Sequence, residues 1–143
     1  MGEKSSPESK MPSVAEYMTP RPHTIGHDQT LERAHEVMRE HGIRHLPVLD
    51  GGKVVGLVSS RDLHLIETLR DVDPHTVFVE EAMAQDPYAV GPETPLAEVV
   101  ATMAERQFGS AIVTDGRGAI GIFTTMDALR ALAALLGLTP RSA

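Results

Sequence analysis

The chain of 143 residues has no cysteine and no tryptophan. The absence of cysteine excludes disulfides, thiolate nucleophiles and zinc sites built on thiolates. Aromatic residues make up only 3% of the sequence, too few for a platform on which nucleic-acid bases stack. No apolar run approaches the roughly 20 residues that cross a bilayer, and the first ten residues lack the apolar core of a secretory signal. We therefore expect a cytoplasmic protein that is not inserted in a membrane.

Basic charge is also scarce. The chain has 13 lysines and arginines against 20 aspartates and glutamates, and its formal net charge is −7. Proteins that hold duplex DNA usually present a clustered basic face, whereas the basic residues here are scattered along the sequence. Nucleic acid is therefore not an expected partner. An anionic small molecule remains compatible with this charge, because a few local donors outweigh a global balance.

The sequence contains an internal repeat. Shifted by 65 positions (83 minus 18, from Met83 and Met18), it aligns without a gap from 14/79 to 62/127, and 13 of these 49 pairs are identical. The identical pairs are Val14/Val79, Glu16/Glu81, Met18/Met83, Pro22/Pro87, Gly26/Gly91, Leu31/Leu96, Met38/Met103, Glu40/Glu105, Val48/Val113, Asp50/Asp115, Gly51/Gly116, Gly56/Gly121 and Asp62/Asp127. We interpret the chain as a tandem duplication: repeat 1 (13–70), a linker (71–78) and repeat 2 (79–137), between tails at 1–12, expected to be disordered, and 138–143.

Each repeat has the pattern of a βαββα unit. A short apolar segment closed by glycine predicts a strand, and apolar residues at helical spacing predict a helix capped by Thr30 or Thr94. Two apolar runs around Asp-Gly predict a hairpin, and a second helix follows, with Ser60 or Thr125 as its cap. One such unit has a small core and an exposed sheet face. We therefore predict an α/β (α+β) fold in which two βαββα units pack through their sheets about a pseudo-twofold axis.

The end of each hairpin carries a hydroxyl and a carboxylate three residues apart. These pairs are Ser59 with Asp62, and Thr124 with Asp127. A carboxylate accepts two hydrogen bonds from a vicinal diol such as a ribose, while a hydroxyl and free helix N–H groups suit a phosphate. The alternative is structural: Ser or Thr caps the helix, and Asp in the first turn offsets the helix dipole by about 0.3–1 kcal/mol. The residues alone leave both interpretations open.

The sequence MTPRPHTI…LPVLDGGKVVGLVSSRD and its second copy MAQDPYAV…AIVTDGRGAIGIFTTMD resemble the cystathionine-β-synthase (CBS) domain family, and two such domains in tandem resemble a Bateman module. The resemblance implies a regulatory module rather than an enzyme, with no required cofactor. Its ligand would be AMP, ADP or ATP, or else S-adenosylmethionine or NADH, bound in clefts between the repeats. Asp62 and Asp127 would hold ribose hydroxyls, with Ser59 and Thr124 near the ribose or phosphate. The residues implied to line the adenine pockets are Thr24, Ile25, Leu46, Pro47, Ala89, Val90, Ala111 and Ile112.

Arg44 and His45 resemble the family position that reaches a phosphate, although a solvated strand start is an equal alternative. Their counterparts in repeat 2, Gly109 and Ser110, are neutral, so we expect the two clefts to be unequal. In the packing that the resemblance implies, one repeat can assist the phosphate bound at the other, so we expect the cleft anchored by Asp127 to be better equipped and the cleft anchored by Asp62 to be weaker or empty.

The remaining features indicate assembly rather than chemistry. The seven histidines form no Ser-His-Asp arrangement or metal-ligand spacing, and we predict neither a catalytic nor a metal site. The last helix, 127–136, is apolar nearly all round. It predicts a homodimer through the closing helices, with burial inside one chain as the alternative. A module that only mediates interactions, with empty clefts, is the alternative to ligand binding, and the regulated protein is not indicated.

Overall fold

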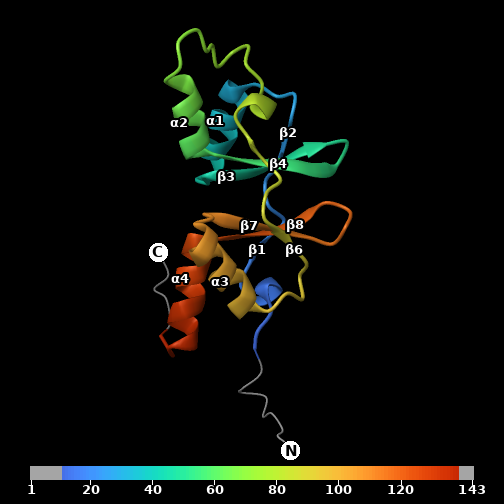
Figure 1. Ribbon diagram of the computed structural model, residues 1–143, viewed down its shortest axis with the longest axis vertical. Coiled ribbons are helices and arrows are strands. Elements are labelled where there is room, and N and C mark those ends of the chain that lie inside the picture. Colours follow the sequence, from blue (N-terminus) through green and yellow to red (C-terminus); the bar gives the residue numbers. More distant parts are fainter. Residues whose placement is uncertain (1–10, 139–143) are drawn as a thin grey trace, which may run out of the picture.

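A computed structural model describes residues 11–138, so the expected tails lie almost entirely outside the described residues. The predicted fold class is confirmed: two four-stranded sheets face each other, and the helices cover their outer faces (Figure 1). The segment with repeat 1 contains η2 (Val14–Glu16), β1 (Thr19–Pro20), β2 (Ile25–Gly26), α1 (Leu31–His41), β3 (His45–Asp50), β4 (Lys53–Ser59) and α2 (Ser60–Glu67). Repeat 2 contains η3 (Val79–Glu81), β5 (Ala84–Gln85), β6 (Ala89–Val90), α3 (Leu96–Arg106), β7 (Ser110–Thr114), β8 (Ala119–Thr124) and α4 (Thr125–Leu135).

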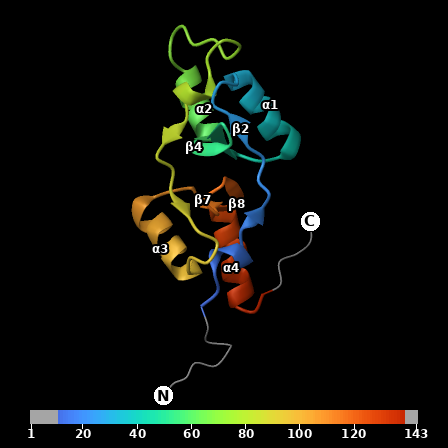
Figure 2. The ribbon, with the colours of Figure 1, turned by 90° about the vertical axis from the view of Figure 1, so that its right-hand side faces the viewer.

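Each sheet contains one strand from the other repeat. The strand orders are β2-β3-β4-β5 and β1-β8-β7-β6. Strand β1 pairs antiparallel with β8, with Thr19 opposite Ile122, and β5 pairs in the equivalent register with β4, with Ala84 opposite Leu57. Figure 2 shows the two connecting segments passing between the halves of the molecule on opposite sides. Strands β1 and β5 were not predicted, because two residues are too short for a periodic pattern.

Each hydrophobic core also contains a residue from the other repeat. Val14, at the start of η2, is fully buried in the core formed under α3 and α4. Val79, at the start of η3, is fully buried in the core formed under α1 and α2. Each core therefore includes a valine that lies at the start of the other repeat in the sequence.

Two identical pairs of the repeat alignment, Met18/Met83 and Gly56/Gly121, have one structural explanation. A Cβ atom at Gly56 would collide with Sδ of Met83, and one at Gly121 would collide with Sδ of Met18. The methionine that introduces each crossing strand therefore packs directly on the backbone of the other repeat, which only glycine permits.

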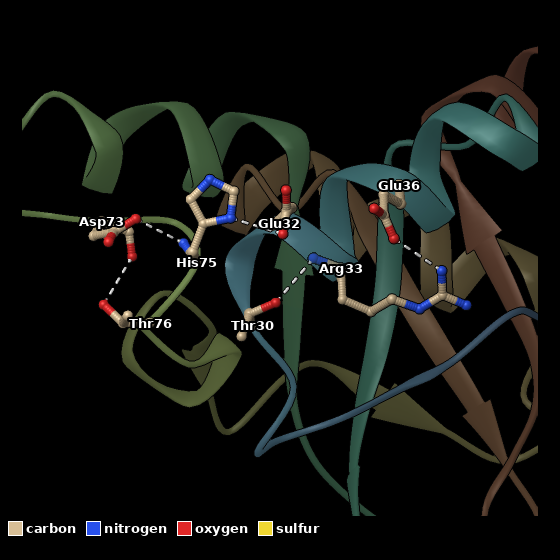
Figure 3. Close-up of polar contacts among 7 residues, drawn as sticks. All are labelled: Thr30, Glu32, Arg33, Glu36, Asp73, His75 and Thr76. Atoms are coloured by element: carbon tan, nitrogen blue, oxygen red, sulfur yellow. Dashed lines mark hydrogen bonds and ion pairs between the residues drawn. The ribbon is translucent and has the colours of Figure 1, made fainter.

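The linker packs on the start of α1 (Figure 3). The backbone N–H groups of Leu31 and Glu32, which have no partner within a helix, donate to the carbonyls of Val77 at 3.0 Å and Pro74 at 2.9 Å. Nδ1 of His75 lies 2.9 Å from Oε1 of Glu32. The linker thus caps a helix rather than running free between the repeats.

The expected helix caps are correct in one case and displaced by one residue in the others. Thr30 accepts a hydrogen bond from the N–H of Arg33 at 3.1 Å, as predicted. In repeat 2, Pro95 occupies the cap position, so the expectation for Thr94 is wrong; the fixed φ of proline fits the residue that precedes the first helical turn. Ser60 and Thr125 are the first helical residues and not the caps.

Candidate functional site

The hydroxyl and carboxylate pairs form capping boxes at the starts of α2 and α4. Ser59 and Thr124 end their strands with an extended backbone, and each side chain accepts the N–H of the aspartate three residues on, at 3.1 and 3.3 Å. In return, Oδ2 of Asp62 and Oδ2 of Asp127 each accept the N–H of the cap residue at 2.9 Å. The structural role is therefore present in both repeats. The capping bond from the backbone occupies one acceptor position of each carboxylate, and the two aspartates differ in how their other positions are filled.

Asp127 uses its remaining acceptor positions within the protein. Oδ2 also accepts the hydroxyl of Thr124 at 3.1 Å. Oδ1 accepts the hydroxyl of Thr19 at 3.1 Å and Nη1 of Arg130 at 3.2 Å. The residue is only 4% exposed. Since a carboxylate offers about four acceptor positions, Asp127 is saturated.

Asp62 occupies the equivalent position with fewer donors. Among residues 11–138, the backbone N–H of Ser59 is the hydrogen-bond donor found on its carboxylate. The counterparts of Thr19 and Arg130 are Ala84 and Leu65, neither of which has a side-chain donor. Asp62 is also half-buried, and it lines a cavity of about 320 Å³ with Leu65, Ile66, Leu69, Glu81 and Ala82. Its carboxylate is therefore both accessible and largely unused.

The residues expected around adenine divide into two groups. Leu46 and Ala111 are fully buried and belong to the cores on the helix side of each sheet, as do Ile25 and Val90. The side chains of these four are occupied by core packing. The residues beside them in the sequence lie elsewhere: Pro47 and Ile112 are buried outside both helix-side cores, while Thr24 is half-buried and Ala89 is exposed.

Because side chains alternate along a strand, Pro47 and Ile112 point from their sheets toward the layer between the repeats. A second cavity, of about 480 Å³, opens between the two hairpin turns and is lined by residues 51–54 and 116–118, with Asp86, Pro87 and Ala89. The space between the repeats is thus bordered by Pro47 and Ile112 and, at the hairpin turns, by glycines together with the charged residues Lys53, Asp86 and Arg117.

His45 lies at the meeting point of the two repeats. A Cβ atom at Gly109 would lie 3.5 Å from Nε2 of His45, so the ring lies against the backbone of repeat 2. Burial lowers the pKa of His45, and Arg44 lowers it further, while the negative charge of Asp62 acts in the opposite direction. Arg44 is exposed. His45 on β3 lies opposite Ser59 on β4, the capping partner of Asp62, which places this strand start beside the cleft of repeat 1.

Residues 11–138 contain neither a metal-binding cluster nor a membrane-spanning helix. This part of the chain contains no group of three or more His, Asp and Glu side chains that could hold a metal ion. None of its helices has the length and apolar character needed to cross a membrane.

Sequence reasoning missed two residues of this site, Thr19 and Arg130. The repeat alignment contained a signal for both, because Thr19 aligns with Ala84 and Arg130 with Leu65. The signal was unreadable without the structure, since nothing in the sequence showed that the first strand of repeat 1 crosses to the carboxylate of repeat 2.

Known proteins resemble this chain along most of its length. The model of the CBS domain matches residues 14–65 and 79–134. An inosine-5'-monophosphate dehydrogenase of Korarchaeum cryptofilum is 34% identical over 105 residues, which are 73% of this chain and 21% of the dehydrogenase. The CBS domain-containing protein YhcV of Bacillus subtilis is 28% identical over 117 residues, 82% of this chain and 83% of YhcV. The chain therefore spans about a fifth of the first relative and most of the second.

Two similar structures contain adenosine derivatives. CBSX2 in complex with AMP has a TM-score of 0.73 and 26% identity, covering 87% of this chain and 98% of CBSX2. The CBS domain pair of protein MJ0100, in complex with 5'-methylthioadenosine and S-adenosyl-L-methionine, has a TM-score of 0.74 and 25% identity, covering 85% of this chain and 99% of that pair.

Proposed function

The chain belongs to the CBS domain family, and from this premise we propose that it is a regulatory module that binds an adenine nucleotide between its two repeats. AMP, ADP and ATP are the favoured ligands, and S-adenosylmethionine and NADH are the other members of the class. The AMP bound to CBSX2 and the adenosine derivatives bound to the MJ0100 pair support this class of ligand. The ligand acts as a signal, and no cofactor is required.

The observation that carries the proposal is the state of the Asp62 carboxylate. It is held in place by the capping box with Ser59, half-exposed, and without a second donor among residues 11–138. An oriented carboxylate with unused acceptor positions is what a ribose diol requires. Pro47 is buried facing the layer between the repeats, and the exposed Arg44 supplies a positive charge for a phosphate, with His45 next to it.

Thermal unfolding in the presence of AMP, ADP, ATP, S-adenosylmethionine and NADH tests this proposal. A ligand at 100 times its Kd adds roughly 2.7 kcal/mol of stability, so at least one of the five should raise the midpoint by several degrees. Guanine and cytosine nucleotides at the same concentrations are the control. The proposal fails if none of the five adenosine compounds stabilises the protein more than these controls.

We propose that the chain acts as a binding module rather than as an enzyme, and that it works in the cytoplasm by controlling a partner protein. The match to YhcV, a CBS domain-containing protein, over 83% of that protein supports a binding module. The ligand would change the angle or the order of the two repeats, and the partner would respond to that change. A module without a ligand, acting through its dimer surface alone, is the competing function.

A homodimer is part of the proposal, because α2 and α4 expose a continuous set of leucines. Both helices lie on the same side of the molecule (Figure 1). The exposed leucines are Leu65 on α2, Leu69 just after this helix, and Leu129, Leu132 and Leu135 on α4, each more than half exposed. Exposed apolar patches of this kind mark association surfaces.

Light scattering at tens of micromolar should give the mass of two chains. Leu132→Glu should give a monomer or an aggregate, whereas Ala97→Glu, on the exposed face of α3, should leave the mass unchanged. A monomeric mass for the unmodified chain would contradict the dimer.

A further inference from the structure

The two clefts of this module differ in one crossing side chain. Thr19 stands on β1 opposite Ile122, and its hydroxyl donates to Oδ1 of Asp127 at 3.1 Å, with Oδ2 at 3.3 Å. Ala84 stands on β5 opposite Leu57, in the equivalent register, and has no hydroxyl to offer Asp62. The backbone arrangement is the same in both places, so the difference lies in the side chain alone.

The Thr19 hydroxyl takes the kind of bond that a ribose hydroxyl would make. A vicinal diol donates two hydrogen bonds to a carboxylate, and it needs two acceptor positions that are free and accessible. At Asp127 these positions are filled by Thr19, Thr124 and Arg130, and the carboxylate is 4% exposed. At Asp62 the capping bond from Ser59 takes one position, and the side chain is half-exposed.

We infer that the module binds one nucleotide per chain, in the cleft anchored by Asp62, and that the Thr19 hydroxyl closes the cleft anchored by Asp127 by occupying its ribose acceptor. This inference rests on the proposed function. It reverses the order of the two clefts that the basic pair Arg44 and His45 suggested in the sequence. Asp127 has a structural role, because its hydrogen bond with Thr19 links α4 to β1. Thr19 determines which cleft is open.

A ligand entering the Asp127 cleft would have to displace donors already bonded to a charged acceptor. Such an exchange forms no more bonds than it breaks, whereas binding at Asp62 adds bonds to an acceptor that lacks them. Because a bond to a charged group contributes about 1.5–3 kcal/mol, the affinities of the two clefts should differ by about tenfold to a hundredfold.

Calorimetric titration of the full chain with AMP tests the inference through reciprocal substitutions at two exposed positions. Thr19→Ala gives repeat 2 the alanine of repeat 1, and a second site per chain should appear. Thr19→Ser keeps the hydroxyl and should keep one site. Ala84→Thr gives repeat 1 the hydroxyl of repeat 2, and AMP affinity should fall by about tenfold. Thermal melting of each variant verifies that it is folded.

Two further variants identify the occupied cleft. Asp62→Asn should reduce AMP affinity by more than about tenfold, whereas Asp127→Asn should leave the single site in place. Two equal sites in the unmodified chain, loss of binding through Asp127→Asn alone, or an unchanged stoichiometry in Thr19→Ala would each overturn the inference while leaving the proposed function intact. Failure of every adenosine compound to bind the unmodified chain would overturn both.

Discussion

In repeat 2, the carboxylate at the start of the closing helix receives hydrogen bonds from Thr19, Thr124 and Arg130 and is almost fully buried. In repeat 1, the equivalent Asp62 receives the capping bond alone among the described residues and remains accessible. The two helices begin with the same capping box on the same strand geometry. The duplicated backbone therefore places two identical anchors, and the side chains that cross from the other repeat decide which of them stays available.

The histidines make a second difference between the repeats. All seven lie between positions 23 and 75, and repeat 2 has none. Three of them contact carboxylates closely: His35 with Glu67 at 2.6 Å, His27 with Glu80 at 2.7 Å, and His75 with Glu32 at 2.9 Å. These contacts join α1 to α2, the loop after β2 to η3, and the linker to α1. Repeat 1 and the linker are thus the part of the chain in which histidine–carboxylate contacts join neighbouring elements.

The largest expected loss of stability comes from truncating a buried residue that lies in the core of the other repeat. Val79→Ala removes a fully buried side chain from the core under α1 and α2. Loss of the buried carbons and the cavity left behind should cost about 2–3 kcal/mol. Because Val79 belongs to repeat 2 in the sequence but to the other core in the structure, amide hydrogen exchange should accelerate mainly in repeat 1.

Val14→Ala is the matched variant. It truncates the equivalent side chain in the core under α3 and α4, so exchange should accelerate mainly in repeat 2, with a similar loss of stability. If each variant loosened the repeat in which it lies in the sequence, the crossing would not carry the cores and the comparison would fail.

The sequence predicted the βαββα plan of both repeats, because hydrophobic periodicity and the Asp-Gly turns are local signals. It also identified Asp62 and Asp127 as a pair, since both follow a strand and a capping hydroxyl. It could not predict that β1 and β5 change partners, which is a property of long-range pairing and not of any window of residues. The unequal state of the two carboxylates follows from that exchange, so it was hidden for the same reason.

A smaller loss of stability is expected from replacing the glycines on which Met18 and Met83 pack. Gly121→Ala should force Met18 away from β8, and Gly56→Ala should force Met83 away from β4. Overpacking of this kind costs about 1–3 kcal/mol. Chemical denaturation of both variants measures the loss.

These two glycine variants also separate stability from binding. Movement of Met18 displaces its neighbour Thr19 from Asp127, so Gly121→Ala should destabilise the protein and yet improve access to the cleft of repeat 2. Gly56→Ala should destabilise without that gain. Ala119→Ser, at the start of β8, should change neither property and serves as the control.

The smallest effect concerns His45, whose counterpart Ser110 does not titrate. Burial lowers the pKa of His45, and Arg44 lowers it further, although Asp62 opposes the shift. A histidine with a lowered pKa in the folded state contributes stability above its unfolded pKa of about 6.5, and this contribution is lost as the pH falls through the folded value. In His45→Gln, the free energy of unfolding should therefore fall less steeply as the pH drops below about 6.5. Any effect of the substitution on packing should not depend on pH, and the difference from the unmodified chain at pH 8 measures it.

The contribution of His27 to stability depends on pH in the opposite direction to that of His45. Its hydrogen bond with Glu80 raises its pKa, against the effect of burial, and Asp50 adds to the increase. That contribution is fully present below the unfolded pKa and is lost as the pH rises through the folded value, so His27→Gln should steepen the acid loss that His45→Gln removes. Urea unfolding from pH 5 to pH 8 measures both slopes. Equal slopes for the two variants would show that the pH response does not arise from these histidines, and the electrostatic difference between the repeats would then lie in their carboxylates alone.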